Sequence, residues 1–68
     1  MEKTILNVEG MACSHCENAI KNAVGALKGV NEVLVDLKAR TVTVQYDISE
    51  VSLEEIKNEI TEQGYDVV

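Results

Sequence analysis

The chain has 68 residues, with twelve acidic side chains against six basic ones, a formal net charge of −6, two cysteines and one histidine. This length suits one small domain, so we expect a single domain over residues 1–68. The acidic balance excludes a nucleic-acid binder, which needs a basic stripe, and the single histidine argues against an enzyme. No apolar run approaches the ~18 residues of a membrane span and no signal peptide precedes the first strand, so we expect a cytoplasmic protein.

The first half of the chain predicts a strand followed by a helix. Residues 4–9 alternate apolar and polar side chains, which is typical of a strand with one buried face. Residues 14–17 read Ser-His-Cys-Glu, which has the S-x-x-E form of a capping box, so we expect a helix to begin at Ser14. Gly25 should weaken the middle of this helix by about 1 kcal/mol relative to alanine, and Gly29 suits a left-handed C-terminal cap. The apolar stripe of the helix comprises Cys16, Ala19, Ile20, Ala23, Val24 and Leu27.

The second half predicts a hairpin, a helix and a short last strand. Alternation of apolar and polar side chains places strands at 32–38 and 41–46, joined by a short connection. A second S-x-x-E sequence begins a helix at Ser52 that ends at Gly64, and residues 65–68 form the last strand. The side chains expected to face the core are Val33, Val35, Leu37, Val42, Val44, Tyr46, Leu53, Ile56 and Ile60.

The predicted order is strand, helix, strand, strand, helix, strand. With right-handed crossovers, this order gives a four-stranded antiparallel sheet with both helices on one face. The polar alternation agrees, because a sheet that is covered on one face is apolar on that face only. We therefore predict an α+β fold of the ferredoxin-like βαββαβ type.

Cys13 and Cys16 form a C-x-x-C pair between the first strand and the first helix, and the second half of the chain carries no equivalent. Zinc sites, dithiol redox proteins and monovalent-metal sites all use such a pair. A closed structural zinc site needs four ligands, and two thiolates with His15 leave it one ligand short. A thioredoxin-like pair usually has proline between its cysteines, whereas this chain contains no proline. A dithiol redox protein remains an alternative that its reduction potential would reveal.

Two thiolates without a third committed ligand suit a soft cation of low coordination number, of which Cu(I) is the physiological example. The N-terminus of a helix favours both the anionic bis-thiolate centre and the thiolate form of Cys16. An exposed two-coordinate ion can accept an incoming thiolate and pass to a second protein through a three-coordinate intermediate. The residues therefore predict Cys13 and Cys16 as metal ligands in a carrier that breaks no bond in a substrate.

The pattern Gly10-Met11-x-Cys13-x-x-Cys16, placed between the first strand and the first helix, resembles the heavy-metal-associated domain. The resemblance spans the whole chain and includes the glycines that follow the two helices. Within this family, an acidic chain with His15 before the second cysteine and Tyr65 near the site is similar to free-standing bacterial copper chaperones.

The resemblance implies Cu(I) bound by Cys13 and Cys16. It implies delivery of this ion to a copper-transporting P-type ATPase, whose N-terminal domains share the fold, or to a copper-responsive repressor. A detached N-terminal domain of such an ATPase is the alternative within the family, and a homodimer that shares copper through four thiolates is a further arrangement. The family pattern also implies that Met11 lies in the core and that Tyr65 lies beside the site, whereas we expect His15 to be solvated.

Overall fold

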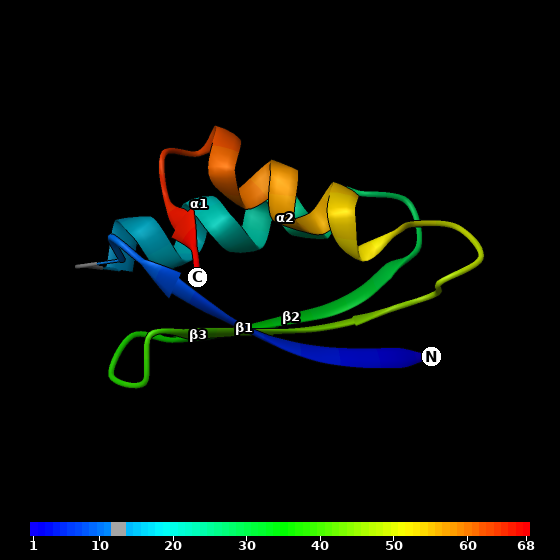
Figure 1. Ribbon diagram of the computed structural model, residues 1–68, viewed down its shortest axis with the longest axis horizontal. Coiled ribbons are helices and arrows are strands. Elements are labelled where there is room, and N and C mark those ends of the chain that lie inside the picture. Colours follow the sequence, from blue (N-terminus) through cyan, green and yellow to red (C-terminus); the bar gives the residue numbers. More distant parts are fainter. Residues whose placement is uncertain (12–13) are drawn as a thin grey trace.

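Six elements follow one another along the chain in the predicted order. The structure, a computed structural model, describes residues 1–11 and 14–68, and for Ser14 the backbone only. The elements are β1 (Glu2–Glu9), α1 (Ser14–Gly25), β2 (Val30–Asp36), β3 (Thr41–Tyr46), α2 (Leu53–Glu62) and β4 (Asp66–Val67). Both termini of the described chain thus belong to the sheet or adjoin it (Figure 1).

The strands form one sheet in the order β2-β3-β1-β4, with every pair of neighbours antiparallel. Both helices lie on one face of this sheet, and the other face is open (Figure 1). β1 and β3 are the two central strands, so each hydrogen-bonds on both sides. The ferredoxin-like arrangement predicted from the order of elements is confirmed.

The core lies between the helices and the covered face of the sheet. Alternate residues of β1 and β3 point into it, so their buried side chains follow the period of two expected for strands. The two helices contribute side chains at helical spacing from the other side. The most deeply buried side chains are Val8, Ile20, Val24, Val42, Val44, Ile56 and Ile60.

The first helix is shorter than the sequence predicts. It ends at Gly25, which therefore terminates the helix and does not lie in its middle. After the helix the chain forms a tighter turn, in which the amide of Leu27 donates a hydrogen bond to the carbonyl of Val24, three residues earlier, at 3.1 Å. Gly29 has the predicted left-handed conformation, with a φ of +98°, but it lies four residues beyond the end of α1 and is therefore not the cap of that helix.

The second strand is displaced toward the N-terminus of the chain relative to its prediction. It begins at Val30 and ends at Asp36, where a carboxylate oxygen accepts the amide of Ala39 at 3.0 Å and starts the turn. Sequence alternation continues through Leu37, which packs against the core although it lies beyond the strand. An alternating pattern does not show where a side chain hydrogen-bonds to a backbone amide and ends the pairing between strands.

The second helix begins as predicted. The Ser52 hydroxyl accepts the amide of Glu55 at 3.2 Å, which is the serine half of the expected capping box. The corresponding prediction for Ser14 falls on a side chain outside the described part of the structure. Two acidic residues in the first turn of α2, Glu54 and Glu55, also suit the positive end of its dipole.

Asp47 organises the loop between β3 and α2, and this predicts a pH effect. The Ser49 hydroxyl and the Ser49 amide both donate to its carboxylate, at 2.7 and 3.0 Å, and lower the pKa of Asp47 below its ordinary 3.8. A carboxyl whose pKa falls on folding stabilises the protein above the unfolded pKa and loses that contribution as the pH drops through the folded one. We expect Ser49→Ala to raise the pKa of Asp47, measured by NMR titration of its carboxyl carbon. Ser52→Ala should leave that pKa unchanged, and an unshifted Asp47 in the Ser49 variant would contradict the assignment.

Gly29 cannot be replaced without cost. A Cβ at this position would lie 2.7 Å from the Cβ of Glu50, and its φ is one that other residues rarely adopt. We expect Gly29→Ala to lower the free energy of unfolding by about 2–4 kcal/mol, measured by urea denaturation. The matched control is Gly25→Ala, where an added Cβ meets nothing within 4 Å, and we expect it to be neutral or stabilising by up to about 1 kcal/mol.

Candidate metal site

The predicted metal loop leaves the sheet at the end of β1, and three segments meet there. The amide of Val8 donates to the carbonyl of Arg40 at 2.9 Å, and the amide of Val68 donates to the carbonyl of Asn7 at 2.8 Å. The β2–β3 hairpin and the C-terminus thus hold the last residues of β1 from two sides. Gly10 follows with a φ of +97°, which turns the chain out of the strand toward α1.

Of the two predicted ligands, the structure places one. Cys16 lies in the first turn of α1, is partly buried and packs against the core cluster, as its place in the apolar stripe predicts. Cys13 lies outside the described residues, and the role of both cysteines as metal ligands stays a prediction. The backbone of Cys16 is therefore fixed relative to the sheet by the packing of its own helix.

The two other candidate residues beside the cysteines lie where the sequence predicts. Met11 is 7% exposed and belongs to the core, so its thioether fills space among the buried side chains. His15 is exposed on the first turn of α1, on a different side of the helix from the core stripe. Of these two residues, Met11 therefore contributes to the core and His15 lies in solvent.

Tyr65 supports the site from the C-terminal segment. It is partly buried against the core, and its Cδ1 atom lies 3.4 Å from the position that a Cβ on Gly10 would occupy. The ring therefore covers the backbone of the residue that begins the metal loop. The prediction that Tyr65 lies close to the loop is confirmed by this contact.

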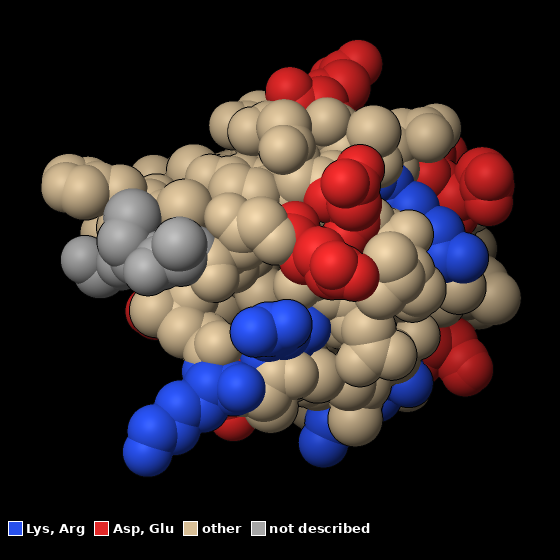
Figure 2. Space-filling view, turned by 60° about the vertical axis from the view of Figure 1, so that its left-hand side comes forward, with Lys and Arg blue, Asp and Glu red and all other residues tan. Residues whose placement is uncertain are grey.

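The charges around the start of α1 are mixed. Glu17 in the first turn pairs with Lys21 one turn later, with 3.6 Å between Oε2 and Nζ, and both side chains are partly exposed. The pair offsets part of the negative charge that Glu17 brings next to Cys16, a predicted ligand. Figure 2, which turns this end of the molecule forward, shows acidic and basic side chains interspersed over the visible face.

One backbone contact near the predicted metal loop is not predicted from the sequence. Arg40, at the end of the β2–β3 connection, adopts a φ of +58° and offers its carbonyl to β1 just before the metal loop. Sequence reasoning treats this segment as a connection only. Asp36, which can accept the amide three residues on, is the local signal for the turn, but the contact with β1 depends on strand pairing across the sheet.

Comparison with known proteins agrees with this arrangement. The heavy-metal-associated domain matches residues 5–66. The chain belongs to the heavy-metal-associated domain family. The resemblance drawn from the loop and its two cysteines is thereby confirmed at the level of the family, and the match runs from β1 into β4.

Three relatives place the chain within this family. It is 47% identical, over all 68 residues of both chains, to the copper chaperone CopZ of Staphylococcus aureus (strain bovine RF122 / ET3-1). A solved CopZ metallochaperone is 46% identical with a TM-score of 0.97, over 98% of this chain and 100% of that one. The Cu(I)-loaded N-terminal domain of a potential copper-translocating P-type ATPase from Bacillus subtilis is 33% identical with a TM-score of 0.93, over 97% of this chain and 82% of that one.

The first two of these relatives carry the names of metal chaperones, which are not enzymes. This agrees with the expectation that the heavy-metal-associated domain described here does not catalyse a reaction. Within residues 1–11 and 14–68, neither helix is long and apolar enough to cross a bilayer.

The burial of Met11 leads to a prediction about its part in packing. We expect Met11→Ala to lower the free energy of unfolding by about 2–5 kcal/mol, because it leaves a cavity in the core. Met11→Leu conserves volume and should cost less than about 1.5 kcal/mol. Urea denaturation of the metal-free protein measures both, and equal losses in the two variants would show that the thioether has a role beyond filling space.

Proposed function

We propose that this protein is a cytoplasmic Cu(I) carrier that holds the ion between Cys13 and Cys16 and passes it by ligand exchange to a copper-transporting P-type ATPase. The observation that carries the proposal is the place of Cys16, partly buried in the first turn of α1 of a heavy-metal-associated domain. The full-length likeness to a protein named copper chaperone supports the choice of metal. In this proposal residues 1–68 act as one domain.

The residues around the loop suit this cargo. Two thiolates form a soft, low-coordinate site, and the amides at the start of α1 favour the anionic complex that they make with Cu(I). Met11 is buried in the core and His15 is exposed, which leaves the thiolate pair as the binding group. The packing of Cys16 on the core gives one sulfur a firm support, while Gly10 allows the chain before Cys13 to turn.

Transfer follows from low coordination. A thiolate of the acceptor adds to the ion, a three-coordinate intermediate forms, and one of the original Cu–S bonds then breaks. Copper stays in the same oxidation state throughout, because only ligands are exchanged. The likeness to the Cu(I)-loaded N-terminal domain of a copper-translocating P-type ATPase supports an acceptor of the same fold. A copper-responsive repressor is an alternative acceptor, and a homodimer that shares copper through four thiolates is a further arrangement.

Removal of either thiolate tests the proposal. We expect Cys13→Ser and Cys16→Ser each to weaken Cu(I) binding by more than about 100-fold, since loss of a ligand exceeds the 10–100-fold effect of its outer partners. Anaerobic titration of the reduced protein against a chromophoric Cu(I) chelator measures this, with Zn(II) titrated in parallel. The Cys16 variant should stay folded, because this side chain is only partly buried at the margin of the core and serine is of similar size, and circular dichroism of both serine variants checks the fold.

Met11→Leu is the matched control and should keep the wild-type Cu(I) affinity. Mixing the loaded protein with a metal-free ATPase domain should move copper to that domain without release to the chelator. Tighter binding of Zn(II) than of Cu(I) by the monomer would overturn the choice of metal, and rapid disulfide exchange with a potential in the range of about −120 to −270 mV would favour a redox protein instead.

A further inference from the structure

The open face of the sheet carries an ordered pattern of side chains that the metal site does not use. Three neighbouring strands, β2, β3 and β1, present three rows across this face. The register of the strands places Ile5, Thr43 and Leu34 in the middle row. Ile5 is 62% exposed and Leu34 is 54% exposed, so two large apolar side chains flank a threonine in solvent.

The rows on either side are polar, and their β1 ends differ from their β2 ends. One row runs Lys3, Gln45, Glu32, and the other runs Asn7, Thr41, Asp36. The β1 side of the face therefore offers a lysine and an amide, and the β2 side offers two carboxylates. The outer members of the rows are all exposed.

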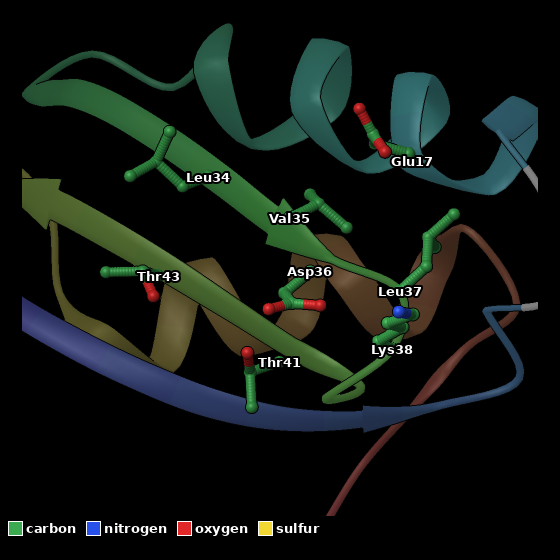
Figure 3. A pocket seen from close by; sticks show the side chains of 8 residues that line it. All are labelled: Glu17, Leu34, Val35, Asp36, Leu37, Lys38, Thr41 and Thr43. Carbon is green, nitrogen blue, oxygen red and sulfur yellow. The ribbon is translucent and has the colours of Figure 1, made fainter.

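The β1 side and the β2 side of the open face also differ in shape. A shallow depression lies over β2 and β3 and reaches around the β2 edge to Glu17 of α1 (Figure 3). Four of its lining residues belong to the rows just described: Leu34, Asp36, Thr41 and Thr43. The protruding side chain of Ile5 stands on the other half, on β1.

We propose that this face is a self-association surface, and that its occupant is a second copy of the chain in a symmetric face-to-face dimer. A two-fold axis that runs parallel to β3, between the two sheets, brings β1 of one copy over β2 of the other. Each Lys3 then faces Glu32 of the second copy, and each Asn7 faces Asp36. Ile5 of each copy enters the depression beside Leu34 of the other.

The proposal follows from complementarity within one sheet. A single two-fold rotation brings opposite charges together, places an amide donor beside a carboxylate acceptor, and sets a protruding side chain over a depression. Because the rotation is two-fold, each contact occurs twice. The area is limited to three strands and the chain carries a net charge of −6, so the dimer is weak and forms at high concentration. It leaves the start of α1 open in both copies, because the helices lie on the opposite face (Figure 1). It does not depend on copper or on the proposed function.

Charge exchange tests the surface. We expect the reduced, metal-free protein, held with a chelator, to show amide NMR shifts that grow from tens of micromolar to millimolar concentration and centre on Ile5, Leu34 and Thr43. Lys3→Glu and Glu32→Lys should each weaken the dimer by about tenfold, because each turns both charge pairs from attraction to repulsion. The double variant, Lys3→Glu with Glu32→Lys, restores opposite charges and should recover wild-type association, measured also by sedimentation.

The two single variants separate this contact from a general effect of charge. Glu32→Lys makes the chain less acidic and would strengthen association if net repulsion alone governed it, whereas the proposed contact requires weaker association. Lys28→Glu, an exposed lysine beyond α1, is the matched control and should associate like the wild type. No concentration dependence at millimolar protein, shifts confined to another surface, or a double variant that stays monomeric would each overturn the proposal.

Discussion

The packing of α1 on the sheet ties the candidate metal site to the core. Ile20 and Val24 are fully buried members of the core cluster, and Cys16 packs against the same cluster one turn earlier. A predicted metal ligand therefore shares its helix face with residues that hold the fold together. Displacement of this helix would move the Cys16 side chain and open the core in one step, so the position of that side chain is as stable as the packing itself.

The two faces of the sheet carry different kinds of side chain. On the covered face, alternate side chains of β1 and β3 are fully or nearly fully buried under the helices. On the open face β1, β3 and β2 carry polar residues and two exposed apolar side chains, Ile5 on β1 and Leu34 on β2. Because successive strand residues point to opposite faces, changes on the open face leave the core in place, and that face can acquire contacts independently of the metal loop.

The backbone around the loop is set by contacts between distant segments. Val8 donates to Arg40, Asn7 accepts from Val68, and Tyr65 covers Gly10. The β2–β3 hairpin, the C-terminus and the segment between α2 and β4 thus converge on the end of β1 and on Gly10, which begins the loop. The proposed transfer of an ion to an acceptor would need such a base, because the predicted metal loop would have to approach another protein while the rest of the domain keeps its shape.

The order of elements, the buried faces, the start of α2 and the C-x-x-C loop could all be predicted from the sequence, because each depends on residues within about four positions of one another. The end of α1 at Gly25 and the end of β2 at Asp36 could not be predicted, because apolar periodicity continues past both residues. After Gly25 a backbone hydrogen bond spans three residues instead of four, and at Asp36 the side-chain carboxylate accepts a backbone amide. Only the tertiary structure brings Arg40 to Val8, Glu50 to Gly29, and Lys3 into one row with Glu32. These neighbours are set by strand register and by the path of the loops, which depend on the packing of the whole chain at once.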